Sequence, residues 1–115
     1  MRDCIDCKIP AKPEYIGIPR LMITGLAAPL DLDFDALEDL KLIITESCNL
    51  SYRMGNEEIL VDAIVEENML TVSVSGVDED KVRNDDMLSL SSHIICSLSD
   101  QVNFEDGKIV VKKAY

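Results

Sequence analysis

The sequence predicts an α+β domain, a two-layer α/β sandwich in which a mixed, mostly antiparallel five-stranded sheet carries three helices on one face. Two pairs of segments with alternating apolar residues are each joined by a short turn, which is typical of β-hairpins. Three other segments carry apolar residues at helical spacing. The resulting order is strand, helix, helix, strand, strand, helix, strand, strand. A chain of 115 residues has room for one such domain, which we expect to span residues 1–115.

The first predicted strand and the first predicted helix lie close together in the chain. Residues 5–9 alternate between apolar and polar side chains, and Pro10 ends this strand. Residues 13–26 then show helical spacing of apolar side chains. Pro19 lies inside this run, where a proline removes a backbone hydrogen bond, so the helix either kinks there or starts later.

The second helix is the clearest helix of the sequence. Asp33 is placed to cap it, and apolar side chains follow one stripe of the helix as far as Cys48. The remaining predicted elements are strands at 59–65 and 70–74, a charged loop at 77–86, a helix at 87–98, and strands at 101–104 and 108–113. Glu67-Asn68 and Asp106-Gly107 are the turns of the two hairpins.

Composition excludes several classes of function. Eleven Lys and Arg residues against 22 Asp and Glu residues give a formal net charge of -11, which repels the phosphate backbone of nucleic acids. Only 4% of the residues are aromatic, so base-stacking surfaces are scarce as well. No apolar stretch is long enough for a membrane span, and the opening residues lack the apolar run of a signal peptide. We therefore expect a cytoplasmic protein that binds neither nucleic acid nor membranes.

The four cysteines raise the question of a metal or redox site. Cys4 and Cys7 form a lone C-x-x-C motif, and its only possible companions are the isolated Cys48, His93 and Cys96. Side chains three positions apart in a strand point to opposite faces of the sheet. Cys4 and Cys7 are therefore not expected to converge on one ion.

Two segments of the chain carry a resemblance to a known family. Residues 9–21 read I-P-A-K-P-E-Y-I-G-I-P-R-L, and residues 37–49 read L-E-D-L-K-L-I-I-T-E-S-C-N. Both resemble the anti-sigma-factor serine kinases of bacterial partner-switching systems, in the histidine-kinase-like ATPase (GHKL) superfamily. Residues 98–102 and the hairpin after them look like the family's last helix and final strands. The resemblance covers nearly the whole chain and implies the histidine-kinase-like ATPase fold.

The resemblance implies a catalytic role for Glu46 and a change at the metal position. In the family this Glu is the general base on the substrate serine, and an Asn four residues later binds the magnesium that bridges the ATP phosphates. Here residue 50 is Leu50, and the only nearby amide is Asn49, rotated by about 100° around the helix. Asn49 is therefore the candidate ligand for both the cofactor and its metal.

The other nucleotide motifs implied by the resemblance are altered as well. Gly76 retains a glycine of the adenine-binding Asp-x-Gly box, but the Asp itself falls on Gly76 or Val77. Ser89 and Ser91 stand where the glycines of the phosphate loop are expected at the opening of the third helix, and glycines there let the backbone approach phosphate. The stretch at 77–86 is short for the flexible ATP lid, which is reduced or missing.

These features lead to three functional hypotheses. The first is an anti-sigma-factor-like regulator that acts by binding proteins, with a degenerate ATP site and no required cofactor. The resemblance implies a sigma factor or an anti-anti-sigma protein as partner, and a homodimer built through residues 15–26 and the first strand. The second is an active serine kinase using ATP and magnesium, with Glu46 as base and Asn49 on the metal. The third, a thiol or zinc protein, depends on Cys4 and Cys7.

Overall fold

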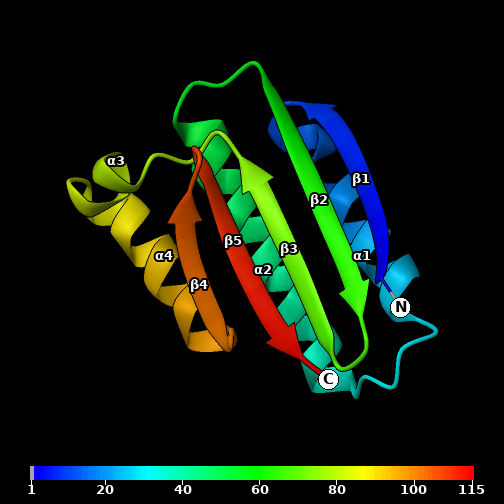
Figure 1. The fold of residues 1–115 in the computed structure, drawn as a ribbon. Helices are drawn as coiled ribbons and strands as arrows, with labels where there is room; N and C mark the ends of the chain where they lie inside the picture. Colours follow the sequence, from blue (N-terminus) through cyan, green and yellow to red (C-terminus); the bar gives the residue numbers. More distant parts are fainter. Residues whose placement is uncertain (1) are drawn as a thin grey trace.

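A five-stranded antiparallel sheet forms one layer of the molecule, and the helices form a second layer against one face of it (Figure 1). The computed structural model describes residues 2–115. The elements are β1 (Arg2–Pro10), a short 3-10 helix η1 (Pro13–Tyr15), α1 (Gly17–Ala27), α2 (Phe34–Arg53), β2 (Glu58–Glu66), β3 (Met69–Ser75), α3 (Glu79–Arg83), α4 (Asp86–Leu98), β4 (Gln101–Glu105) and β5 (Lys108–Ala114). The predicted fold class is confirmed.

The strands lie in the order β1-β2-β3-β5-β4. Every neighbouring pair is antiparallel, so the sheet is wholly antiparallel where the sequence predicted a mixed one. Both predicted hairpin turns are confirmed. In the second, Asp106 and Gly107 both have positive φ values, of 53° and 71°, as a two-residue turn matched to the strand twist requires. β1 and β4 form the two outer edges of the sheet.

The helical layer differs from the prediction in two places. Pro13–Tyr15 forms a separate 3-10 turn and α1 begins at Gly17, so Pro19 lies in the first turn of α1. Backbone N–H groups in the first turn of a helix have no partner within that helix, so Pro19 removes no hydrogen bond from α1. Of the two alternatives, a kink at Pro19 or a later start of the helix, the structure shows the later start. The charged stretch predicted as a loop at 77–86 contains α3, which makes four α-helices in residues 2–115 where three were expected.

The core lies between the sheet and the helical layer. Alternate residues of the central strands face it, including Val61 of β2 and Val72 of β3, while their neighbours in sequence face the open side of the sheet. Asp33 caps α2, its carboxylate accepting a hydrogen bond from the Ala36 amide at 2.8 Å. Among residues 2–115 there is no helix with the length and apolar content that a membrane span requires.

Candidate functional site

α2 carries the residues that the sequence nominated for the general base and the metal. Glu46 and Asn49 are both half-buried on this helix. In the described part of the chain, Glu46 has no ion-pair partner within 4 Å. Leu50, at the position of the expected magnesium ligand, is 0% exposed and belongs to the apolar core. Position 50 is therefore packed in the core, whereas Glu46 and Asn49 are partly exposed to solvent.

Gly76 lies in the turn that follows β3, with φ at +73°. The Asn56 side chain occupies the space beside it. Asn56 Nδ2 donates hydrogen bonds to the carbonyls of Gly76 and Ser51, both at 2.8 Å, and lies 3.3 Å from Ser51 Oγ. A Cβ added at Gly76 would lie 2.7 Å from Asn56 Cγ and 2.9 Å from Ser51 Oγ. The glycine is thus required by a polar contact between the end of α2 and this turn.

Sequence reasoning did not single out Asn56. The only signal was its place directly after Gly55, which reads as an ordinary turn at a helix end. Its function in the structure depends on Ser51 and Gly76, and Gly76 lies twenty residues further along the chain. A long-range contact of this kind leaves no periodic pattern in the sequence.

Ser89 and Ser91 lie inside α4 and do not open it, contrary to the placement expected from the sequence. α4 begins at Asp86, and the amide of Ser89 already donates to the carbonyl of Asp85 at 2.8 Å. Ser91 is only 6% exposed and lies on the buried side of a helix that packs against α2. The backbone N–H groups here are engaged within the helix, and none is presented as a loop around a phosphate.

The N-terminus of α4 is capped by the carboxylate of Asp85. Asp85 Oδ1 accepts hydrogen bonds from the amides of Met87 at 2.9 Å and Leu88 at 3.0 Å. Asp86 adds a second negative charge in the first turn. A helix N-terminus attracts anions through its free N–H groups and the positive end of its dipole. Here Asp85 accepts hydrogen bonds from two of these N–H groups, and the negative charges of Asp85 and Asp86 lie at the positive end of the dipole. The amides of Met87 and Leu88 at the start of α4 are thus engaged by the Asp85 side chain.

The stretch expected as a shortened lid is folded. Asp78 caps α3 by accepting from the Asp80 amide at 2.9 Å, and Arg83 pairs with Glu79 at 2.6 Å along the helix. Val82 anchors the short helix with only 3% of its surface exposed. Asp at the cap, acids in the first turn and bases in the last turn were the sequence signals for α3.

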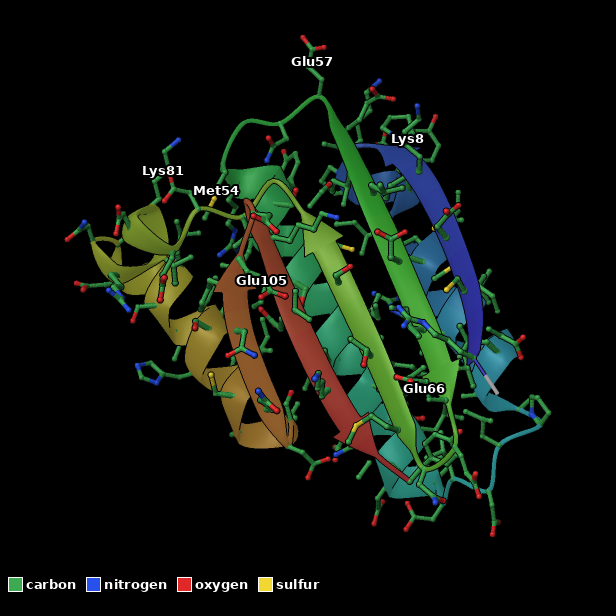
Figure 2. All side chains as sticks on the ribbon, in the orientation of Figure 1. Lys8, Met54, Glu57, Glu66, Lys81 and Glu105 are labelled. Carbon is green, nitrogen blue, oxygen red and sulfur yellow. The ribbon has the colours of Figure 1, made fainter. Side chains whose placement is uncertain are left out.

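A hollow of about 430 Å³ lies next to Gly76, between the end of α2, α3 and the turn from β4 to β5. Figure 2 labels Met54, Lys81 and Glu105 around it. Its carboxylates come from Asp78, Glu79, Glu105 and Asp106, and Lys81 is the one basic side chain among its lining residues. This excess of negative charge opposes the entry of a triphosphate.

The cysteines do not form a cluster with metal-binding geometry. Cys4 is exposed and Cys7 is half-buried on β1, as expected for side chains on opposite faces of a strand. Burial raises the pKa of the Cys48 thiol to about 12, and burial also raises the pKa of Cys7, with Asp6 and Asp62 adding to the effect. Within residues 2–115, no three His, Cys, Asp or Glu side chains are arranged to hold a metal ion.

The open five-stranded antiparallel sheet with its helices on one face is consistent with the fold of histidine-kinase-like ATPase domains. Comparison with known proteins identifies the family within this class. A Bacillus subtilis protein named serine-protein kinase RsbW is 33% identical over an alignment of 107 residues that covers 85% of this chain and 67% of that protein. The chain therefore belongs to the RsbW family of anti-sigma-factor serine kinases.

Two further relatives bear the same name. The Bacillus velezensis protein is 40% identical over 81 residues, 70% of this chain and 46% of its own length. The Listeria monocytogenes protein is 38% identical over an alignment of 80 residues that covers 65% of this chain and 51% of the relative's own length. The chain thus spans about half to two thirds of the length of these curated relatives. No model of a known protein family matches it.

Leu50→Asn should lower the free energy of unfolding by about 3 kcal/mol or more, because it leaves a cavity and buries an amide without partners. Leu50→Met, which roughly preserves the side-chain volume, should cost less than about 1.5 kcal/mol. Urea denaturation followed by circular dichroism measures both variants. If Leu50→Asn were as stable as the parent, position 50 would face an open site and not the core.

Gly76→Ala should cost about 2 to 3 kcal/mol, since it combines a positive φ with displacement of the Asn56 amide. Gly107→Ala is the matched control, because Gly107 has φ of +71° and nothing within 4 Å of an added Cβ. This control should cost about 1 to 2 kcal/mol, from backbone strain alone.

Thermal denaturation in an Asn56→Ala background separates the two costs of Gly76→Ala, which are the backbone strain at positive φ and the displacement of the Asn56 amide. With the amide gone, Gly76→Ala should cost less than it does in the parent protein, and the contact that remains is the one of 2.9 Å between the added Cβ and Ser51 Oγ. An equal cost of Gly76→Ala in both backgrounds would mean that the Asn56 contact contributes nothing.

Proposed function

We propose that this protein is an anti-sigma-factor-like regulator of bacterial transcription that acts by binding proteins, with an ATP site too altered for efficient nucleotide binding. Membership of the RsbW family supplies the partner-switching context. The observation that carries the proposed loss of ATP binding is the capped N-terminus of α4. There Asp85 accepts the hydrogen bonds of the Met87 and Leu88 amides, which a phosphate at this helix end would otherwise receive. The buried Leu50 and the acidic hollow beside Gly76 support it.

The partners that fit this proposal are a sigma factor or an anti-anti-sigma protein. Neither requires a nucleotide to be bound, since regulation by sequestration needs only a complementary surface. The net charge of -11 favours partners with basic surfaces and disfavours nucleic acid. The cytoplasm is the compartment in which such partners are found.

Calorimetry with ATP and magnesium tests the altered site. No binding tighter than about millimolar is expected, which corresponds to about -4 kcal/mol. The Bacillus subtilis serine-protein kinase RsbW, titrated in the same buffer, serves as the positive control. A micromolar dissociation constant for this chain would contradict the proposal.

One observation favours an active serine kinase as the second candidate. Glu46 is half-buried with no cation within 4 Å in residues 2–115, so its carboxylate is available as a base, and Asn49 lies close by on the same helix. Radiolabel transferred from ATP to a serine of an added anti-anti-sigma protein, and lost in Glu46→Gln, would support this candidate.

The proposed function includes a homodimer formed through α1 and β1. α1 leaves Ile18 48% exposed and Leu21 72% exposed on its outer side, although both are large apolar residues. Sedimentation analysis should therefore give a dimer that Leu21→Glu converts to a monomer. Leu90→Glu on α4, where Leu90 is 56% exposed, is the matched control and should leave the dimer intact. A monomeric parent protein would contradict this part of the proposal.

A further inference from the structure

β4 is the outermost strand of the sheet on the side away from α1 and β1 (Figure 1). It pairs with β5 in a register that runs from Gln101 opposite Lys112 to Glu105 opposite Lys108, and no strand of residues 2–115 pairs with its outer edge. Backbone groups along such an edge are free to pair with a further strand. Because the proposed homodimer uses α1 and β1, this edge lies outside the contact between copies.

The apolar core is incomplete beside β4. Val102 and Phe104 are only half-buried, although they lie in the row of side chains that faces the helical layer. Their partners on β5, Val111 and Ile109, are 2% and 0% exposed. A further strand would place its own inward side chains beside Val102 and Phe104, and would cover apolar surface that water now contacts.

β4 lacks the side chains that commonly prevent pairing at the edge of a sheet. Such edges often carry Lys or Pro, or a bulge that twists the strand away. β4 has the sequence Q-V-N-F-E, which contains neither residue, whereas β1 carries Lys8 and ends in Pro10. The protection of β4 is limited to its length of five residues and the charge of Glu105. The edge is thus open to a strand of similar length.

The side of the molecule formed by α3, α4 and β4 is strongly acidic. Residues 78–107 contain only two basic side chains, Lys81 and Arg83, and Arg83 is already paired with Glu79. Eight acidic against two basic side chains leave six negative charges on this segment. The acidic residues are Asp78, Glu79, Asp80, Asp85, Asp86, Asp100, Glu105 and Asp106. A charge of this size attracts basic segments and repels acidic ones.

Two lysines of β5 face the same side of the sheet as Glu105, but neither one pairs with it. Lys108 stands opposite Glu105 in the register, and its Nζ lies 4.0 Å from the carboxylate of Asp62 on β2. Lys112 stands opposite Gln101, at the other end of β4. The outer side of Glu105 is therefore left to a cation from an added strand.

We propose that β4 binds an extended, basic segment of a partner protein, which joins the sheet as a sixth strand. Backbone hydrogen bonds attach it to the free edge, and its apolar side chains at alternate positions cover Val102 and Phe104. Lys or Arg on its other face approaches Glu105. This binding mode rests on the proposed function for the existence of protein partners. It involves no nucleotide, so ATP calorimetry and the peptide titration below succeed or fail independently.

A second copy of this chain is the less suitable occupant. Two β4 strands paired antiparallel about Asn103 would place each Glu105 opposite Gln101 of the other copy, with no cation for either carboxylate. Both copies would also bring the same acidic side of the molecule to the contact. A basic extended segment pairs with the same backbone groups without this repulsion.

Nuclear magnetic resonance of the ¹⁵N-labelled full chain tests the binding, with the acetylated, amidated peptide Lys-Val-Thr-Val-Lys as probe. Titration should shift the backbone amides of Val102, Asn103 and Phe104 with one common dissociation constant, at or below about a millimolar. Exchanging both Lys of the peptide for Glu, or both Val for Ser, should weaken binding by about tenfold. Equal binding of the three peptides, shifts confined to other elements, or no shift at millimolar concentration would overturn the proposal.

Methylated peptides test whether the probe binds as a strand. In an added strand the amides of alternate residues face β4 and the remaining amides face solvent. We therefore compare methylation of the two Val nitrogens with methylation of the Thr and last Lys nitrogens. One of these peptides should bind about tenfold more weakly than the parent peptide, and the other should bind within about twofold of it. A comparable loss with both, or with neither, would contradict strand addition.

Charge variants test whether Glu105 meets a cation of the probe. Glu105→Gln should weaken binding about threefold and reduce its dependence on salt. Glu67→Gln, in the exposed β2–β3 turn, removes the same charge elsewhere and should change the affinity by less than about 1.5-fold. Equal effects of the two variants would reduce the attraction to net charge and rule out a defined site at β4.

Spectra recorded without peptide distinguish a second copy as occupant. If the β4 resonances shift or broaden with protein concentration alone, the edge pairs with another copy and the proposal is wrong. Unchanged β4 resonances over the same concentration range, together with binding of the probe, support it.

Discussion

The side-chain amide of Asn56 holds together the end of the molecule where the candidate site lies. The carbonyl of Ser51 near the end of α2 accepts a hydrogen bond from the Met54 amide at 3.2 Å, and the Asn56 amide donates a second one to it at 2.8 Å. The same nitrogen binds the carbonyl of Gly76 and so fixes the point at which the chain leaves β3. Because the amide occupies the space beside Gly76, no side chain can be accommodated there without displacing it.

Further contacts extend from this point to the rest of the site. The amide of Val77 donates to the carbonyl of Gly107 at 3.0 Å, and the amide of Asp78 lies 3.2 Å from the sulfur of Met54. The end of α2, the exit from β3 and the β4–β5 turn are thereby joined before α3 begins. These bonds fix the point from which the chain enters α3.

The serines of α4 also have an energetic consequence for the helix. Glycine is less favourable than serine inside a helix by about 0.5 kcal/mol per residue. Ser89 and Ser91 therefore favour continuous helix through the region that the resemblance assigns to a phosphate loop. Local propensity and the Asp85 cap favour the same conformation, in which the amides are engaged by the protein and not by a ligand.

The sequence predicted those parts of the structure that depend on local patterns. The strands, both hairpin turns and the cap of α2 by Asp33 follow from periodicity and turn chemistry, which act over a few residues. α3 was missed because the charge of residues 77–86 was read without its capping signals. The contact between Asn56 and Gly76 depends on how distant segments pack, and no local pattern encodes it. Leu50 lies seven residues after Ile43 on the buried side of α2, a helical spacing that the family comparison of position 50 left out.

The outer position of β1 has a consequence for how the protein behaves at high concentration. One side of this strand offers unpaired backbone groups, which in other sheets act as templates for edge-to-edge growth into fibres. Asp3, Asp6 and Lys8 place charges along this edge, and Pro10 has no N–H to donate. A strand added in register would bring like charges together and would lose a hydrogen bond at Pro10. The edge that remains open in the sheet is thus protected against polymerisation by its own side chains.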